Sequence, residues 1–284
     1  MNVAASNRRL FPARTVVLWL HLVLVALSSM LSALPALAQT STAVVALDTR
    51  PNVKVKILLL RPSNPVAVVV LLTGGDGIIK LADDGAIGRG GNFLVRSREQ
   101  FTTHSLLVAV MDAPSDRSGG DGLTNAFRQS AEHVQDLGAV VAYLRKEFNL
   151  PVWLVGTSRG TVSAVAGTIG LKNSGPDGVV LTSSLVSGGD GQLSRLSLDQ
   201  IRVPTLVVHH EEDECKFCRF ADVPRLMDGL KNAPSKELIT FKGGMRERDG
   251  NWRPCEAFSH HGYYGIEDSV VNAVGQWVIA KSKS

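Results

Sequence analysis

The sequence predicts an α/β fold with a mostly parallel central sheet and helices on both faces. Short apolar runs alternate with segments of helical periodicity from residue 39 onward. Some of these runs are apolar throughout, as strands are when both faces of a parallel sheet are covered. One run, 151–155, continues through a glycine-serine turn into a helix of small residues. Alternation of this kind is typical of parallel strands joined by crossover helices.

The individual elements follow from local periodicity. Apolar residues alternate with polar ones from Val53 to Ile57, which indicates a strand with one covered face. The clearest helix is 130–148, where apolar residues recur three and four positions apart from Val134 to Leu144. The expected strands are 42–48, 53–60, 66–72, 106–111, 151–155, 178–181, 205–209 and 237–241, and the expected helices are 91–102, 130–148, 161–167, 221–231 and 267–281.

Residues 1–38 have the pattern of an export signal. Three arginines form a basic start without any acidic residue, residues 16–34 are largely apolar, and an Ala-Leu-Ala cleavage site precedes Gln39. The alternative is an uncleaved membrane anchor, because the apolar run approaches the ~20 residues that a span needs. We expect cleavage, a single domain over residues 39–284, and a secreted or periplasmic protein with no stable membrane association.

The charge of the chain gives no reason to expect a nucleic-acid partner. The full chain carries 30 basic and 26 acidic side chains. Residues 1–38 hold three of the arginines and no acid, so 27 basic and 26 acidic side chains remain after cleavage. The sequence also has no basic stripe with interleaved aromatic residues. A small-molecule substrate is therefore the expected partner.

A serine between a strand and a helix is the strongest chemical signal in the chain. Gly156-Thr157-Ser158-Arg159-Gly160 follows the run 151–155 and opens the helix of small residues. A sharp turn there lifts the serine hydroxyl above the sheet edge, and the two glycines let the chain bend. We expect Ser158 to be a nucleophile and the Arg159 amide, at a helix N-terminus, to donate to an oxyanion. The alternative is an ordinary serine that caps a helix.

A carboxylate and a histidine follow the serine in positions that suit a catalytic triad. Asp213 stands just past a strand end, where a short carboxylate on a tight turn can orient an imidazole, and Glu212 is the second choice. His261 precedes the last helix, and Gly262 leaves backbone room beside its ring. His260 is then expected to pack or to line the cleft. The alternatives are a solvated acidic turn and surface histidines.

Two further segments are expected to meet the substrate. The turn Gly74-Gly75-Asp76-Gly77 follows the central strand. We expect the Gly75 amide, with Gly74 as the second choice, to complete the oxyanion hole, and Asp76 to contact the substrate; a plain glycine turn is the alternative. The connection 243–259 is long, so we expect it to overhang the site and to place Trp252 against the substrate.

Together these features resemble the α/β-hydrolase superfamily. The order Ser158, Asp213, His261, the glycine turn after the third strand and the His-Gly before the last helix are similar to its pattern over about residues 42–279. The acid turn is similar to the family's H-G-x-x-D, with His210 where glycine is common. The resemblance implies hydrolysis of an ester or amide through an acyl-enzyme, without a cofactor. The connection 182–204 is short, so little or no lid is expected.

The three cysteines fit an oxidising compartment. Cys215 and Cys218 follow Asp213, and Cys255 lies shortly before His261. We expect one of the pair to bridge Cys255, with Cys218 taken as the partner, which would tie the acid loop to the base loop. A bridge between Cys215 and Cys218 is the alternative. No metal site is expected, because the chain has no second cysteine pair at zinc-finger spacing.

The sequence therefore predicts an exported serine hydrolase that cleaves carboxylic esters. A peptidase or amidase with the same triad is the nearest variant. A non-catalytic binding protein on the same scaffold is the alternative from another functional class. The presence of all three triad residue types speaks against it.

Overall fold

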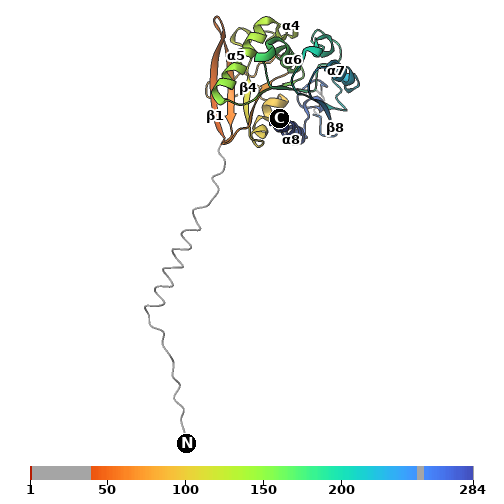
Figure 1. Ribbon diagram of the computed structural model, residues 1–284. Coiled ribbons are helices and arrows are strands. Elements are labelled where there is room, and N and C mark those ends of the chain that lie inside the picture. The colour runs from red at the N-terminus through yellow and green to blue at the C-terminus, as the bar shows by residue number, and fades with distance from the viewer. Residues whose placement is uncertain (2–39, 248–252, 284) are drawn as a thin grey trace. The chain divides into compact units, whose positions relative to one another are not determined.

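The structure is a computed structural model that describes Met1 and residues 40–247 and 253–283 (Figure 1). The chain divides into a unit Met1–Gln39 and a compact unit Thr40–Ser284, and the elements below all belong to the second unit. Except for Met1, the expected signal segment 1–38 lies outside the described residues. Within the described ranges, no helix has both the length and the apolar character that a membrane span requires.

A sheet with the strand order β1-β2-β4-β3-β5-β6-β7-β8 forms the centre of this unit. β2 pairs antiparallel with β1 and β4, and every other neighbouring pair is parallel. This confirms the mostly parallel sheet, and each expected strand is present. The strands are β1 (Ser41–Arg50), β2 (Val53–Arg61), β3 (Ala67–Leu72), β4 (Leu106–Met111), β5 (Val152–Thr157), β6 (Gly178–Thr182), β7 (Thr205–His210) and β8 (Lys236–Phe241).

The central strands are apolar because both of their faces are covered. Every residue of β3 to β7 is buried, whereas the edge strands β1 and β8 keep exposed residues. Successive residues of β3 enter opposite cores: Val68 and Val70 pack in one, and Val69 and Leu71 pack in the other. This is the burial that a parallel sheet between two helical layers requires.

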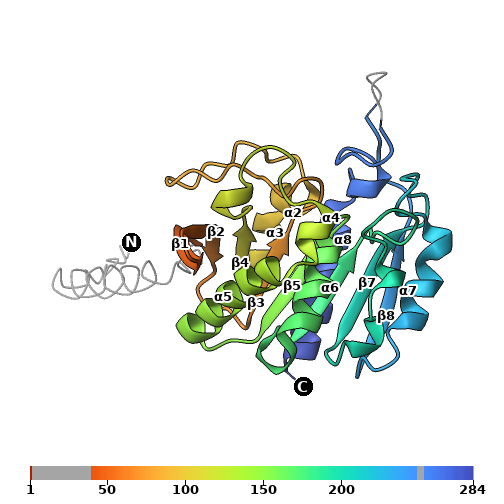
Figure 2. The same ribbon diagram turned by 90° about the horizontal axis from the view of Figure 1, so that it is seen from above.

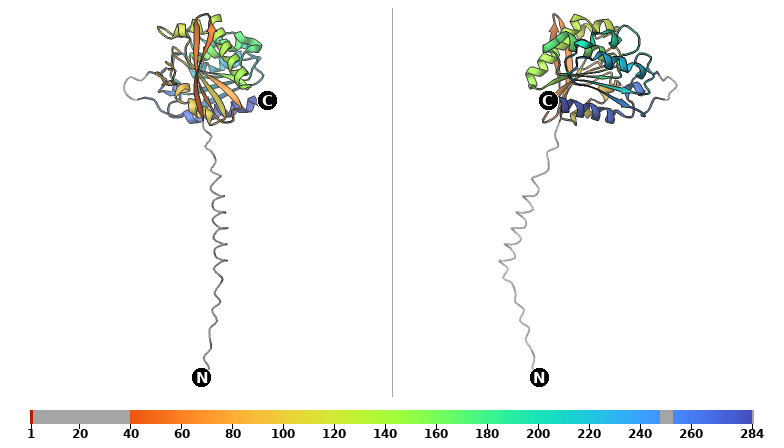
Figure 3. Two further views of the ribbon diagram at one scale, coloured as in Figure 1. Left: turned by 90° about the vertical axis from the view of Figure 1, so that its left-hand side faces the viewer. Right: turned by 45° about the vertical axis from the view of Figure 1, so that its right-hand side comes forward.

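The helices cover the sheet in two layers, which confirms helices on both faces (Figures 2 and 3). One core contains residues of α5, α6 and α7, and the other contains residues of α2, α3 and α8. A short helix, α4, precedes α5. The helices are α2 (Phe93–Arg96), α3 (Arg98–Thr102), α4 (Asn125–Arg128), α5 (Ala131–Phe148), α6 (Gly160–Leu171), α7 (Val223–Gly229) and α8 (Glu267–Ser282).

One expected helix is divided, and one connection is short. The segment 91–102 forms α2 and α3, which are separated at Ser97. The Ser97 hydroxyl donates to the Phe93 carbonyl at 2.5 Å, and a serine that bonds back by one turn competes with the helical backbone.

Between β6 and β7, the chain forms only the short 3₁₀ turns Leu193–Arg195 and Leu198–Gln200 as regular structure. This connection agrees with the expectation of little or no lid.

Gly178 gives a test of the packing between β6 and the α8 layer. A Cβ at Gly178 would collide with the ring of Trp153, which is buried and packs edge-on against Trp277. We expect Gly178→Ala to lower the free energy of unfolding by about 1–3 kcal/mol, because overpacking forces the ring to move. Urea unfolding followed by tryptophan fluorescence measures this loss.

The matched control is Gly119→Ala. Gly119 is exposed, and a Cβ there would meet no atom within 4 Å. We expect its free energy of unfolding to stay within about 0.5 kcal/mol of the wild type. Equal stability of the two variants would contradict the packing at Gly178.

Candidate active site

Ser158 stands on a strained turn between β5 and α6. Its φ of 53° lies in the left-handed region, which is unfavourable for a residue with a side chain. Its amide donates to the Thr182 carbonyl at 3.0 Å, so the turn is held against the end of β6. A Cβ at Gly156 would lie 2.5 Å from the Gly160 carbonyl oxygen, and a Cβ at Gly160 would collide with the Leu72 carbonyl. Close backbone contacts therefore require both glycines of the motif.

Asp213 and His261 meet as a buried pair. A carboxylate only accepts, so the Nδ1–H of His261 donates to Asp213 Oδ2, at 2.9 Å. Asp213 Oδ1 accepts from the Cys215 amide at 2.9 Å, which fixes the carboxylate. Burial by itself lowers the pKa of His261, but the Asp213 carboxylate and the nearby Cys218 sulfur together raise that pKa well above its ordinary value. The same bond leaves Nε2 of the ring free to take a proton.

His210 stabilises the turn that carries Asp213. It stands where the H-G-x-x-D pattern of the superfamily has glycine. Its Nδ1 accepts from the Glu212 amide at 3.1 Å, so its Nε2 carries the proton and donates to the Gly243 carbonyl at 2.8 Å. Its ring stacks on that of His260, with the centroids 4.5 Å apart. Glu212, the second choice for the acid, is exposed, and the structure places Asp213 on the buried imidazole.

The loop that carries His261 is held by contacts to the ends of β6 and β7. The Ser259 hydroxyl accepts from the His261 amide at 3.2 Å, and the Ser183 hydroxyl donates to the His261 carbonyl at 2.7 Å. The hydroxyl of the buried Tyr263 donates to the Val208 carbonyl at 2.9 Å. These contacts fix the imidazole relative to the carboxyl ends of the strands.

The loop after β3 lies against the serine turn. Gly75 has a φ of 58°, and a side chain there would point into open space. A Cβ at Gly74 would lie 3.0 Å from the Ser158 Cβ, so this position needs a small residue. Neither the Gly75 amide nor the Arg159 amide donates a hydrogen bond to another described residue. Both expected oxyanion donors therefore belong to the two segments that meet at Ser158, and neither amide is used by the described backbone.

A buried arginine that the sequence did not single out anchors this loop. Arg128 donates through Nη2 to the Thr73 and Gly75 carbonyls at 3.1 and 3.3 Å, and through Nη1 to the Ser163 hydroxyl at 2.8 Å. The two carbonyls flank the peptide group that carries the Gly75 amide, so these bonds orient the amide. Burial, assisted by the positive charge of Arg159, lowers the pKa of Arg128 to about 9. Its sequence neighbourhood carries no signal, because only the tertiary structure buries it.

Comparisons with known proteins agree with this architecture. No family model and no curated protein matches the sequence. Among solved structures, a fungal esterase from Rhizomucor miehei is 13% identical, covers 92% of this chain and 90% of its own, and has a TM-score of 0.60. Dienelactone hydrolase from Anabaena variabilis is 16% identical, with 86% and 97% covered and a TM-score of 0.55. A cold-adapted esterase from an Arctic intertidal metagenomic library is 17% identical, with 84% and 94% covered and a TM-score of 0.56.

The chain has the α/β-hydrolase fold.

Beside Ser158, the hydrolase fold contains a cavity of about 810 Å³. The loop after β3 and the loop of His261 both line it, and so do the side chains of Asp76 and Arg89. These two form an ion pair at 2.6 Å. Burial raises the pKa of Asp76, but the Arg89 guanidinium outweighs it, so the pKa falls below its ordinary value. Asp76 thus lies where a substrate contact was expected, already paired with a cation.

The connection after β8 borders the same cavity. Its lining residues include Glu247, Arg253 and Phe258. The expected contact residue Trp252 lies outside the described residues. The side chain of Arg159 is turned elsewhere: its Nε donates to Asn125 Oδ1 at 2.9 Å. The cations that line the cavity therefore come from the loops and not from the serine turn.

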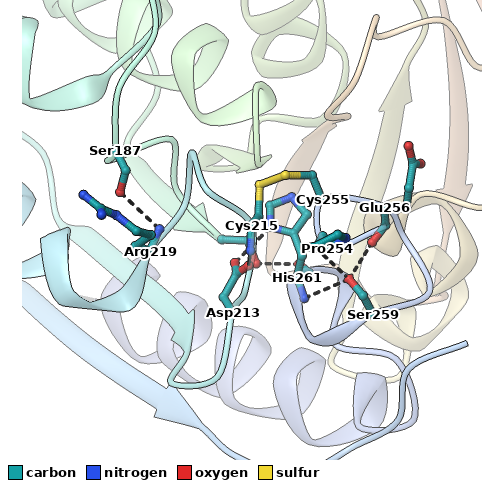
Figure 4. Close-up of a disulfide and its surroundings, with 10 residues drawn as sticks. Ser187, Asp213, Cys215, Arg219, Pro254, Cys255, Glu256, Ser259 and His261 are labelled. Carbon is teal, nitrogen blue, oxygen red and sulfur yellow. Dashed lines mark hydrogen bonds and ion pairs between the residues drawn. A yellow bond between two sulfur atoms is a disulfide. The ribbon is translucent and has the colours of Figure 1, made fainter. Parts of the chain in front are cut away.

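The disulfide joins Cys215 to Cys255, so the expected bridge from Cys218 is wrong (Figure 4). The turn that carries Asp213 continues to Cys218, whose amide donates to the Cys215 carbonyl at 2.8 Å. This turn directs Cys218 into the core, where it is fully buried. Cys255 is exposed and lines the cavity, and its partner in the bridge is Cys215. The disulfide still links the turn after Asp213 to the loop before His261. Figure 4 shows it beside the Asp213–His261 pair.

The free, buried Cys218 thiol lies near the imidazole of His261. Ser158 and His261 line the same cavity, yet no hydrogen bond joins the serine hydroxyl to the imidazole among the described residues. The Cys218 sulfur lies within 4.8 Å of a ring nitrogen of His261. Catalytic hydrogen bonds are often loose in a site without substrate, so this spacing is compatible with proton transfer once a substrate is bound.

Loss of the disulfide is expected to destabilise the fold. We expect the double variant Cys215→Ser/Cys255→Ser to lose about 2–4 kcal/mol of unfolding free energy, because the bridge restricts the unfolded chain over a separation of 40 residues. Urea denaturation in the presence of a chelator measures the loss. Wild-type protein reduced under the same conditions is the control and is expected to match the variant. An unchanged midpoint in both would contradict the prediction.

Proposed function

We propose that this protein is an exported serine hydrolase that cleaves carboxylic esters through Ser158, His261 and Asp213. One observation carries the proposal: a strained serine turn and a buried Asp-His pair open onto one cavity. A left-handed serine is unfavourable unless its surroundings hold it, and such strain is concentrated at functional sites. A histidine with Nδ1 bound to a carboxylate has its second nitrogen poised to accept a proton.

In the first half-reaction, Nε2 of His261 takes the Ser158 proton while the serine oxygen attacks the ester carbonyl. The Gly75 and Arg159 amides stabilise the oxyanion that forms, and the bonds from Arg128 hold the first of these amides in place. Asp213 keeps the imidazole in the required tautomer and stabilises its charged form. The imidazolium then returns the proton to the leaving alcohol.

In the second half-reaction, water replaces the alcohol. His261 takes a proton from the water as it attacks the acyl-serine carbonyl, and the same two amides stabilise the second oxyanion. Collapse of this intermediate releases the acid and returns the proton to Ser158. Every step uses groups of the chain itself, so the reaction needs no cofactor.

The cavity favours small or extended polar esters over long-chain lipids. It is lined by both acidic and basic side chains, and the short connection between β6 and β7 builds no helical lid above it. The structural neighbours include a dienelactone hydrolase and esterases, which supports ester chemistry. The Cys215–Cys255 bridge and the signal-like residues 1–38 support export, because structural disulfides persist in oxidising compartments.

Turnover of p-nitrophenyl acetate and butyrate tests the assigned residues. We expect Ser158→Ala and His261→Ala each to lower kcat by about 10³-fold or more, because nucleophile and base act as one unit. His260→Ala is the matched control and is expected to keep activity, since its ring packs on His210 outside the pair. Circular dichroism checks that each variant is folded.

A fluorophosphonate probe separates the alternatives. It is expected to label wild-type protein and not Ser158→Ala. Turnover that survives in Ser158→Ala would refute the nucleophile. A folded wild-type protein with neither turnover nor labelling would favour the binding-protein alternative, and labelling with turnover of amides alone would favour an amidase.

The pH dependence of kcat/KM tests the Asp213–His261 pair. The base must be neutral, and its pKa is raised, so the acidic limb of the wild-type profile is expected above pH ~6.5, the ordinary value for histidine. In Asp213→Asn the carboxylate is gone and burial remains, which lowers the pKa. The limb is therefore expected to move to lower pH, while kcat falls by about 10⁴-fold. An unmoved limb would show that Asp213 does not act on the base.

A further inference from the structure

The side chains around the disulfide form a cluster of sulfur and nitrogen donors. Ligand atoms of Cys215, Cys218 and His261 all lie within 4.8 Å of one another, and all three residues are buried. The disulfide holds the Cys255 sulfur against that of Cys215. Two sulfurs and one imidazole nitrogen thus form a compact cluster, and the Cys255 sulfur is bonded to one of these sulfurs at 2.06 Å, although the chain brings the residues from two loops.

This donor set is that of a structural zinc site. Tetrahedral Zn²⁺ with three cysteines and one histidine is a common combination, and Zn–S bonds of ~2.3 Å place neighbouring ligand atoms roughly 3.8 Å apart. The donor atoms of Cys215, Cys218 and His261 lie within 4.8 Å of one another and reach that geometry by small side-chain rotations. Reduction frees the Cys255 sulfur from Cys215 to rotate into the fourth position. Cys215 and Cys218 also have the C-x-x-C spacing of such sites, with the Cys218 amide bonded to the Cys215 carbonyl.

The histidine is already oriented as a metal ligand. Its Nδ1–H is bound by Asp213, so Nε2 is the nitrogen with a free lone pair. A carboxylate that holds the second nitrogen of a ligating histidine fixes the ring and makes it a stronger donor. The Cys218 sulfur, within 4.8 Å of a ring nitrogen of this imidazole, is the neighbouring ligand.

We propose that reduction of the Cys215–Cys255 disulfide converts the catalytic centre into a zinc site formed by Cys215, Cys218, Cys255 and His261. A dithiol supplies two electrons and two protons, the S–S bond breaks to two thiols, and the dithiol becomes a disulfide. Zn²⁺ then displaces one proton from each of the three thiols and takes the lone pair of Nε2. Cys255 is exposed, which gives the reductant and the metal an entry path.

Zinc in this position stops the proposed hydrolysis. The metal occupies the nitrogen that must accept the Ser158 proton, so the reduced, zinc-bound protein has no general base. Exchange with a small-molecule disulfide, which takes up the two electrons and is reduced to two thiols, re-forms the Cys215–Cys255 bond, removes two ligands and releases the metal. In the oxidised protein, Cys218 and His261 remain as two ligands, which is too few for stable binding of Zn²⁺.

Titration with Co²⁺ under anaerobic conditions tests the site on the whole protein. Reduced wild-type protein is expected to bind one Co²⁺ per chain, with sulfur-to-cobalt charge-transfer absorption and the visible bands of tetrahedral Co²⁺, and Zn²⁺ is expected to displace it. Oxidised protein is expected to show neither band. Absence of these bands from the reduced, folded protein would overturn the proposal, as would equal bands in the oxidised form.

Two variants assign the ligands. Cys218→Ser removes one of three thiolates, so the charge-transfer intensity is expected to fall by about a third and the Kd for Co²⁺ to rise at least tenfold. His261→Gln is expected to keep the sulfur bands and to weaken binding by a similar factor. Binding that is unchanged in both variants would refute this ligand set. If reduction unfolds the metal-free protein, Zn²⁺ must restore its circular dichroism spectrum, and failure to do so also refutes the site.

An activity measurement adds a second readout, which rests on the proposed hydrolase function. Zn²⁺ is expected to abolish ester turnover by the reduced protein, and a chelator is expected to restore it. The cobalt spectra do not depend on any enzymatic activity. Cobalt spectra without hydrolysis would support the metal site and contradict the proposed function. Hydrolysis without the spectra would support the function and contradict the metal site.

Discussion

The backbone at the start of α6 touches the backbone that leaves β3, with no room for a Cβ between them. The parallel pairing of β3 with β5, in which Leu72 stands opposite Gly156, sets this contact. It forces Ser158 into the left-handed region and brings the glycine loop against the serine turn. Because side chains alternate between the faces of a strand, a shift of this register by one residue would turn the serine away from the cavity.

Two buried polar networks flank the serine turn. On one side, Arg128 holds the loop after β3, and His133 bonds to the same Ser163 hydroxyl at 2.8 Å. Burial, with the charge of Arg128 nearby, lowers the pKa of His133 to about 3, so this histidine is neutral. On the other side, Asp213 holds His261. Both networks lie away from water, where hydrogen bonds are stronger and unsatisfied groups are costly.

A single hydrogen bond connects the two proposals. The bond from His261 Nδ1 to Asp213 leaves Nε2 as the reactive nitrogen, whether it receives a proton from Ser158 or binds a metal. What separates the two roles is the oxidation state of Cys215 and Cys255. While they are bridged, the sulfurs are occupied with each other and the imidazole is left to the serine.

Local periodicity and glycines required by backbone contacts belong to the sequence alone, so it was enough to predict the strands, the serine turn and the chain order of Ser158, Asp213 and His261. It named Asp213 and His261 as partners, and the structure joins these two side chains by a hydrogen bond. Tertiary structure alone decided that Cys215 takes the bridge, since two cysteines three positions apart are equivalent until the fold buries one of them. It also decided the role of Arg128, because burial of a cation depends on contacts between segments that are distant in the chain.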